Sequence, residues 1–257
     1  MANDSTSMSV QPGLWLDAVT IMRGIRPIIH EFSHHLNMGQ LGLVHGANGA
    51  GKTTLLRAIA GRLPLESGVI SVKTTSNPQD TGNPQDTGNP QDTGNPKDTG
   101  NPQDTGTAVI IEAPRLYVGH KDGLSSQMSG RENLQSWAAM TGYGDRHMIE
   151  AAFDMLGCMG FADSLVQMLS RGQRRRLALA RLLLGPGKAL WLLDEPNVGL
   201  DDDARDALDH MITAHIGKGG MVLAATHLDL APALGKKRQI WTLGHRGHRG
   251  QMGHKDA

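Results

Sequence analysis

The nine residues from 46 to 54 place the strongest constraint on the fold of this chain. They read Gly-Ala-Asn-Gly-Ala-Gly-Lys-Thr-Thr and match G-x-x-x-x-G-K-[ST], the pattern of a phosphate-binding loop. Glycines let the backbone wrap so that successive N–H groups point at one anion, and the helix that follows directs its positive end at the same group. An apolar run over 41–44 predicts a buried strand before the loop, and apolar residues at helical spacing over 55–60 predict a helix after it.

The residues of this loop have different expected roles. Lys52 is expected to reach the β- and γ-phosphates of a nucleotide, and the Thr53 hydroxyl to bind Mg²⁺. The alternative is a glycine-rich turn that matches the pattern by chance, and the strand–loop–helix context argues against it. We therefore predict that the phosphates are bound by Gly46, Ala47, Asn48, Gly49, Ala50, Gly51, Lys52, Thr53 and Thr54.

A pair of carboxylates follows a second apolar run. Residues 189–193 read Ala-Leu-Trp-Leu-Leu and lead into Asp194, Glu195 and a proline. Such a run predicts a strand buried on both faces, as in a parallel sheet, and ligands bind at the carboxyl ends of such strands. We expect Asp194 to hold Mg²⁺, directly or through water, and Glu195 to polarise the attacking water. The alternative is an acidic turn after a strand.

A second anion site is predicted at the start of a strong helix over 170–184. The stretch 169–173 reads Leu-Ser-Arg-Gly-Gln, and Ser170 together with the Gly172 amide would face an anion at this helix N-terminus. Three consecutive arginines follow at 174–176, and we expect at least one of them to lie on a solvated basic face.

One histidine lies where it could report the presence of a phosphate. His227 comes shortly after an apolar run over 221–225, which predicts another buried strand. An imidazole at the end of that strand can hydrogen-bond a γ-phosphate. The alternative for a single histidine is a core residue, and the presence of the other motifs favours the phosphate sensor.

Further strands are predicted over 14–22, 28–36, 109–111, 116–118 and 240–243, with a short exposed strand over 67–73. Further helices are predicted over 131–140, 148–156 and 205–216. The chain has 257 residues and zero formal net charge, which fits one α/β domain and argues against a nucleic-acid binder that relies on a basic face. The single cysteine, Cys158, excludes an internal disulfide and agrees with a reducing compartment.

The apolar runs and the first residues of the chain indicate where in the cell the protein is expected to lie. No apolar run approaches the ~18 residues of a membrane span, and residues 1–11 lack the apolar core of a signal peptide. We therefore expect a cytoplasmic chain whose attachment to a membrane comes through a partner. The tail over 244–257 is expected to be disordered; its histidines could bind a metal or heme, but a solvated tail is favoured.

An internal repeat interrupts the chain between two predicted strands. Asn-Pro-Gln-Asp-Thr-Gly occurs five times from 77 to 106, with Lys97 replacing glutamine once. The block has no apolar residue, so it cannot form a β-solenoid core or compensate for its ordering entropy. We expect a disordered insertion at the tip of a strand–strand connection, with a binding tether as the alternative. Its deletion is then expected to change stability by roughly 1–2 kcal/mol at most.

In this order and spacing, the motifs resemble the ATP-binding subunit of ABC transporters over roughly 14–243, apart from the repeat. The resemblance implies an α/β P-loop NTPase fold with a mostly parallel core sheet, an antiparallel β subdomain and a small helical subdomain. It implies one ABC ATPase domain over 1–257, with its core at 14–123 and 170–243 and the helical subdomain at 124–169.

The same resemblance implies that each ATP lies between two copies of the domain. Two domains pair head to tail, and the phosphate loop of one faces the signature motif of the other. Residues 169–173 match the signature motif, so Ser170, Gly172 and Gln173 would contact the partner's nucleotide. Asp201 matches the acidic residue of the D-loop, and His227 matches the switch histidine.

Two stretches are similar to one subfamily, the cytochrome c biogenesis ATP-binding proteins (heme exporter protein A, CcmA). Residues 117–124 read Tyr-Val-Gly-His-Lys-Asp-Gly-Leu and residues 131–134 read Arg-Glu-Asn-Leu. This group carries histidine where most relatives have the Q-loop glutamine, and His120 takes that position, with an expected contact to the bound nucleotide. The similarity implies an ATPase that energises heme export or heme handling in c-type cytochrome biogenesis.

The implied partners are a second copy of this chain and two copies of a multi-span membrane permease (CcmB-like). The implied location is peripheral, on the cytoplasmic face of the bacterial inner membrane. ATP and Mg²⁺ are the implied cofactors. An ABC exporter for another cargo is the alternative within this class.

Two alternatives to a transporter ATPase come from other functional classes. An ABC ATPase without a transporter, such as a translation or DNA-repair factor, needs two such domains or a long coiled-coil insertion, and neither is present. A nucleotide-binding scaffold without turnover is disfavoured because Lys52, Asp194, Glu195 and His227 are all in place.

Three positions depart from the usual ABC pattern. Arg171 stands where glycine is usual in the signature, and His120 replaces glutamine. The stretch 21–24, where an aromatic residue usually stacks on adenine, has none, and Arg23 could stack its guanidinium plane instead.

Overall fold

The computed structural model describes residues 12–74 and 107–244. The predicted repeat insertion at 77–106 and residues 1–11 lie outside the described residues. So does the predicted tail at 244–257, apart from Gly244. None of the helices in the described ranges has the length and apolar character needed to cross a membrane.

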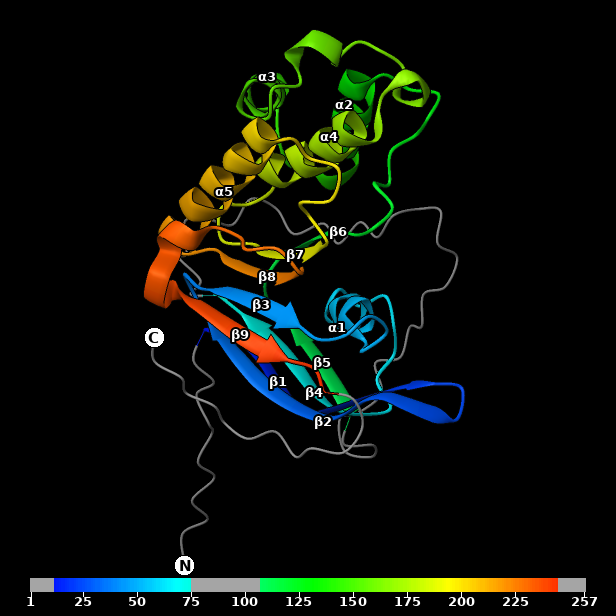
Figure 1. Ribbon diagram of the computed structural model, residues 1–257, viewed down its shortest axis with the longest axis vertical. Helices are drawn as coiled ribbons and strands as arrows, with labels where there is room; N and C mark the ends of the chain where they lie inside the picture. Colours follow the sequence, from blue (N-terminus) through cyan, green and yellow to red (C-terminus); the bar gives the residue numbers. More distant parts are fainter. Residues whose placement is uncertain (1–11, 75–106, 245–257) are drawn as a thin grey trace, which may run out of the picture.

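The core of the molecule is a five-stranded sheet in which every neighbouring pair of strands is parallel. Its strands, in spatial order, are β6 (Arg115–Val118), β7 (Leu190–Asp194), β8 (Met221–Ala225), β3 (Leu41–His45) and β9 (Arg238–Thr242). All residues of β7 and β8 are buried, as their continuous apolar runs predict. The predicted parallel core sheet and the predicted edge strand near residue 240 are confirmed. The loops that follow β3, β6, β7 and β8 start from the same edge of the sheet (Figure 1).

A second sheet of four strands packs below the first (Figure 1). Its strands, in spatial order, are β2 (Arg26–Asn37), β1 (Gly13–Arg23), β4 (Ser67–Lys73) and β5 (Thr107–Ile111). The β1–β2 and β1–β4 pairs are antiparallel, as the resemblance implies. The prediction that the strand over 67–73 is exposed is wrong. This strand, β4, lies between β1 and β5, and its side chains Ile70 and Val72 are fully buried.

The pairing of β4 with β5 bears on the predicted insertion between them. These two strands are parallel, with Gly68 opposite Thr107 and Val72 opposite Ile111. A strand–strand connection with a tip joins antiparallel neighbours, whereas parallel neighbours need a crossover of about a dozen residues or more. The predicted tip at 77–106 lies outside the described residues and stays a prediction, but the parallel pairing means that β4 and β5 do not form a hairpin. Lys73 and Thr107 therefore lie at opposite ends of the paired strands.

This geometry changes the expected result of deleting the repeat. Lys73 lies about 17 Å along the sheet from the level of Thr107, by the rise of a strand. Without residues 77–106 only three residues remain between the two, and they reach at most about 14 Å. We expect the full deletion to break the β4–β5 pairing, at a cost of about 1–3 kcal/mol, and to lower the thermal midpoint by roughly 5 °C.

A partial deletion is the matched control. Removing residues 77–94 takes out three repeats and leaves fifteen residues for the crossover. We expect its thermal midpoint to stay within about 2 °C of the parent chain, because shortening a flexible connection changes its closure entropy only slightly. Equal midpoints for the full and the partial deletion would contradict the parallel pairing.

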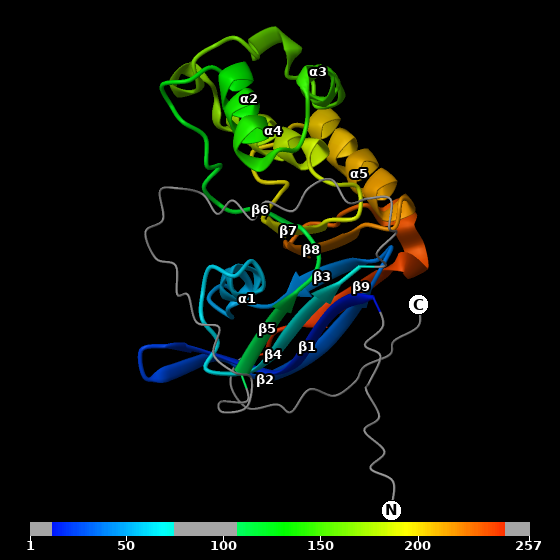
Figure 2. The same ribbon diagram turned by 180° about the vertical axis from the view of Figure 1, so that it is seen from behind.

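Helix α1 (Lys52–Ile59) lies between the two sheets (Figure 1, Figure 2). Its side chains Leu55, Leu56 and Ile59 are fully buried in one cluster with residues of β1, β4, β7 and β8. This packing fixes the helix against both sheets. Since the phosphate loop runs directly into α1, the packing also fixes the loop.

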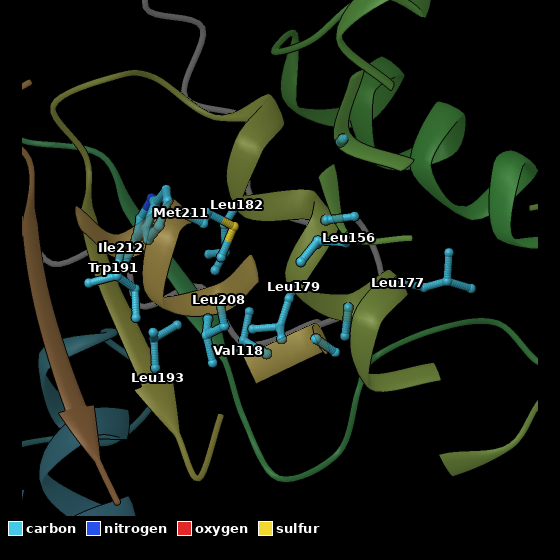
Figure 3. Close-up of a cluster of buried hydrophobic side chains, with 14 of the residues drawn as sticks. Val118, Leu156, Leu177, Leu179, Leu182, Trp191, Leu193, Leu208, Met211 and Ile212 are labelled. Atoms are coloured by element: carbon cyan, nitrogen blue, oxygen red, sulfur yellow. The ribbon is translucent and has the colours of Figure 1, made fainter. Parts of the chain in front are cut away.

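The opposite face of the parallel sheet is covered by α4 (Arg171–Leu184) and α5 (Asp202–Gly217) (Figure 1). Figure 3 shows the apolar cluster that joins them to the sheet. Its labelled members are Val118, Leu156, Leu177, Leu179, Leu182, Trp191, Leu193, Leu208, Met211 and Ile212. At roughly 1.5–3 kcal/mol for each large apolar side chain buried, this cluster is the main force that holds α4 on β6 and β7.

The remaining helices lie beyond α4 in Figure 1. They are α2 (Gly130–Thr141), α3 (Arg146–Met155) and the 3₁₀ turns Met159–Phe161 and Val166–Met168; a further 3₁₀ segment, Pro232–Lys237, precedes β9. Ser129 and Glu132 form a reciprocal capping box that starts α2, and Gly142 ends it in a left-handed conformation. All predicted helices and strands in the described ranges are present within a few residues of their expected bounds. The division into a core and a helical subdomain at 124–169 stays a prediction.

Candidate active site

The phosphate loop lies between β3 and α1, and its backbone depends on glycine at the helix start. Gly51 is the N-cap of α1 with φ 101°, in the left-handed region that glycine adopts readily. A Cβ there would lie 2.8 Å from Ile28 Cγ2 of β2, so no side chain fits. The loop therefore leaves the first amides of α1 open to an anion, while Ile28 closes one side.

Lys52 is buried, and its ammonium group lies inside the loop. Its Nζ donates to the Gly46 carbonyl at 2.7 Å and contacts His227 Nε2 at 3.0 Å. The same ring nitrogen of His227 lies 3.2 Å from Asn48 Oδ1 and 3.7 Å from Glu195 Oε1. Residues from the loops after β3, β7 and β8 therefore meet at one point.

Thr53 and Asp194 form a pair of oxygen ligands beside this point. Thr53 Oγ1 donates to Asp194 Oδ1 at 3.0 Å, and Asp194 is 3% exposed. The Tyr117 hydroxyl lies 3.5 Å from the other carboxylate oxygen. Burial raises the pKa of Tyr117, and the charge of Asp194 adds to the increase, so the phenol stays a donor.

This pair suits Mg²⁺. A hydroxyl and a carboxylate are hard oxygen ligands, and Mg²⁺ is bound through one or two carboxylates together with substrate phosphates and water. An ion between Thr53 and Asp194 would replace the hydrogen bond that joins them. The oxygen atoms of Thr53 and Asp194 are therefore suitable ligands for Mg²⁺.

Glu195 has an unusual backbone. Its φ is 48°, in the left-handed region, and its N–H donates to the Ala225 carbonyl of β8 at 2.8 Å. Its side chain is 26% exposed and borders a cavity of about 20 Å³, room for about one water molecule. The cavity is lined by His120, Asp122, Arg171, Arg175, Glu195 and Val198. His120 thus reaches the surroundings of Glu195 from the end of β6.

The signature residues lie at the start of α4. Ser170 is the N-cap, its hydroxyl accepts from the Gln173 N–H, and Gln173 accepts from the Ser170 N–H. A Cβ on Gly172 would lie 2.5 Å from the Gly199 carbonyl, so only glycine fits there. Asp201 caps α5 by accepting from the Ala204 N–H at 3.1 Å. Within the described part of the chain, no hydrogen bond joins these residues to the phosphate loop.

The three arginines at 174–176 were expected to include at least one on a solvated face, and Arg174 and Arg176 are half-buried with partial contact to solvent. None of them is fully exposed: Arg174 donates to the Leu169 carbonyl, and Arg176 pairs with Asp201 at 3.8 Å. Arg175 is 4% exposed. Burial lowers the pKa of its guanidinium, and the Asp122 carboxylate partly offsets this effect.

Sequence reasoning missed Arg175, Asp122 and Ile28 as neighbours of the site. A signal existed for Arg175, because it precedes Ala178, Leu179 and Leu182 at helical spacing and therefore belongs to the buried face of α4. Asp122 and Ile28 had no such signal, because their positions depend on how loops and sheets meet. Arg23 is exposed near the tip of the β1–β2 hairpin.

Comparison with known proteins places these observations in a family. The model of the family described as ABC transporter matches residues 29–198, about two thirds of the chain. The matched part contains the phosphate loop, the signature residues and the two carboxylates at the end of β7.

Individual relatives point to a narrower group within this family. The chain is 37% identical over 216 residues to the cytochrome c biogenesis ATP-binding export protein CcmA of Xanthomonas oryzae, covering 84% of this chain and 87% of the relative. It is 35% identical to the protein of the same name from Xylella fastidiosa, covering 87% of each chain. For the Paracoccus denitrificans protein of that name, the identity is 34% and the coverage is 82% of this chain and 81% of the relative.

Solved structures share the fold at low sequence identity. A putative ABC transporter ATP-binding protein from Pyrococcus furiosus matches with a TM-score of 0.61 and 19% identity, over 90% of this chain and 97% of that one. A structure described as the ATP-binding subunit of an ABC transporter matches with a TM-score of 0.65 and 18% identity, over 91% and 89%.

Proposed function

Because the chain belongs to the ABC transporter family, and within it to the cytochrome c biogenesis ATP-binding export proteins (CcmA), we propose that it drives heme export or heme handling for c-type cytochromes. As a member of this family, it is an ATP-binding subunit that hydrolyses ATP. The meeting of Lys52, His227 and Glu195 at the ends of three strands is the structural observation that best supports a working ATPase.

Each residue of the site has a role that its position supports. Lys52 pairs its charge with the β- and γ-phosphates in place of the Gly46 carbonyl. Thr53 and Asp194 hold Mg²⁺, which neutralises phosphate charge when it is bound. Glu195 orients the attacking water and takes its proton, while His227 donates a hydrogen bond to the γ-phosphate.

A second copy of the chain completes the site in this proposal. Ser170, Gly172 and Gln173 lie at the start of α4, and within the described ranges they form no hydrogen bond to the phosphate loop of their own chain. Amides at a helix N-terminus are suited to a phosphate, so these residues can serve the nucleotide of a partner. Asp201 and His120 are the further contacts between the copies and the nucleotide.

The transport step needs a membrane partner. We assign that role to two copies of a multi-span permease (CcmB-like), with the ATPase dimer bound peripherally on the cytoplasmic face of the inner membrane. The support is the relatives' name, which describes an export protein of cytochrome c biogenesis. ATP hydrolysis opens the dimer, and this motion acts on the permease.

Loss of the protein tests the cellular role. We expect a deletion strain to lack holo-c-type cytochromes and to keep b-type cytochromes, because only the c-type class depends on the proposed pathway. Heme-stained gels and reduced-minus-oxidised spectra of membranes measure the two classes. Complementation with the parent gene should restore the c-type bands, and complementation with the Glu195→Gln gene should not. Normal c-type bands in the deletion strain would instead favour an exporter of another cargo.

A further inference from the structure

Arg175 lies at the junction of three parts of the site. It belongs to α4, the helix that begins with the signature residues, and its guanidinium lies between the ends of β6 and β7. A buried charge is costly unless hydrogen bonds satisfy it, and a guanidinium offers five N–H donors in a fixed planar arrangement. The partners of these donors therefore show what this residue holds in place.

Three of the partners are consecutive carbonyls at the end of β7. Nη2 donates to the carbonyls of Asp194 at 2.8 Å and Glu195 at 2.9 Å, and Nε donates to that of Pro196 at 3.3 Å. The first two carbonyls belong to the peptide groups on either side of the Glu195 Cα. One guanidinium thus sets both peptide planes that flank Glu195, and these planes define its φ and ψ.

The backbone of Glu195 needs such a restraint. A glutamate rarely adopts a left-handed conformation, and it persists only where the surroundings impose it. The N–H of Glu195 is fixed by the Ala225 carbonyl, and its C=O by Arg175. Released from Arg175, the residue would relax toward the ordinary region, and its carboxylate would turn away from His227.

The remaining donor group connects this restraint to the loop after β6. Nη1 of Arg175 donates to the Gly119 carbonyl at 2.7 Å and to Asp122 Oδ1 at 3.2 Å. His120 lies between these two partners in sequence and borders the same cavity as Glu195 and Arg175. The guanidinium therefore fixes the segment around His120 relative to Glu195.

From this geometry we infer that Arg175 is a positioning residue for ATP hydrolysis. It holds Glu195 in the left-handed conformation that directs the carboxylate toward His227, and it sets the distance between Glu195 and the loop after β6. Arg175 does not touch the nucleotide in this inference. Its loss should therefore lower kcat and leave ATP affinity unchanged. The inference rests on the proposed role of Glu195.

The test compares two arginines of the same helix, the buried Arg175 and the half-buried Arg181. Lysine keeps the charge of Arg175 but cannot reach four carbonyls and a carboxylate at once. For Arg175→Lys in the full chain we expect a 10- to 100-fold lower kcat, with an ATP dissociation constant within twofold of the parent chain. The control is Arg181→Lys, because Arg181 binds the carbonyls of Ala178, Asp122 and Gly123 and has no hydrogen bond to residues 194–196.

The control separates positioning from general destabilisation. We expect Arg181→Lys to lower the thermal midpoint and to keep kcat within about threefold, with assays run well below both midpoints. Equal losses of kcat in the two lysine variants, or a loss of ATP affinity in proportion to kcat, would overturn the inference. If Arg175→Lys does not fold, Asp122→Asn tests the same restraint through its ion pair, with an expected loss of kcat of several-fold at unchanged affinity.

A double-mutant cycle tests whether Arg175 acts through Glu195. In the Glu195→Gln background, Arg175→Lys should cause less than a twofold further loss, because the group it positions no longer functions. A full additional loss would overturn the inference. If Glu195→Gln alone retained turnover, the proposed role of Glu195 would fail and this inference with it. If Arg175→Lys retained turnover beside an inactive Glu195→Gln, only this inference would fail.

Discussion

Glu195→Gln is expected to lower ATP turnover by about 10²- to 10⁴-fold, the range over which a general base contributes. Glutamine keeps the size and can keep the backbone of Glu195, but it cannot take a proton from water. The bond from Glu195 N–H to Ala225 and the bonds from Arg175 to the carbonyls do not involve the carboxylate, so the fold of the loop is expected to survive. ATP affinity should stay within a few-fold of the parent chain.

Two measurements define this result. The kcat at saturating ATP reports the loss of turnover, and analytical ultracentrifugation with ATP reports a trapped dimer, because hydrolysis would no longer open it. Glu112→Gln is a matched control, since Glu112 pairs with Lys73 at the surface of the second sheet. Turnover within a few-fold of the parent chain would mean that Glu195 is not the base.

Lys52→Ala is expected to weaken ATP binding by about 10- to 150-fold. The lysine ammonium is the buried cation of the phosphate loop, and a hydrogen bond to a charged group contributes about 1.5–3 kcal/mol. Its removal leaves phosphate charge unpaired at the point where His227 and Asn48 meet. The amides at the start of α1 remain, so some affinity should persist.

Isothermal titration calorimetry with ATP and Mg²⁺ measures this change directly. Lys218→Ala, at the exposed end of α5, removes the same charge from the chain without touching the loop. The thermal midpoint without nucleotide should fall slightly, because the variant also loses the hydrogen bond from Lys52 to the Gly46 carbonyl. An unchanged dissociation constant for Lys52→Ala would contradict the assignment of the phosphate loop.

The sequence predicted the parts of the molecule that depend on local pattern. The phosphate loop and the carboxylates at the end of β7 follow from short motifs next to continuous apolar runs. Parallel strands bring their carboxyl ends to one edge, which explains why Lys52 lies beside His227 and why Glu195 also lies near this histidine, although both follow Lys52 by more than 140 positions.

The features that were not predicted from the sequence share a different cause. The orientation of β5 relative to β4 depends on a long connection whose composition says nothing about direction, so the parallel pairing was not predictable. Three adjacent arginines resemble a solvated face, and only their alignment with the apolar positions of α4 distinguishes the buried one. Ile28 reaches Gly51 through the meeting of a sheet and a loop, which no pattern in either segment encodes.

The left-handed backbone of Glu195 has a consequence for laboratory evolution. A glutamate in this conformation carries about 1–3 kcal/mol of strain, which glycine or asparagine would reduce. Screening for thermal tolerance alone would thus reward exchange of the very residue to which we assign the chemistry. Activity and robustness compete directly at this one position. A heat-resistant version of this motor would have to gain its robustness elsewhere, with residue 195 held constant throughout the selection.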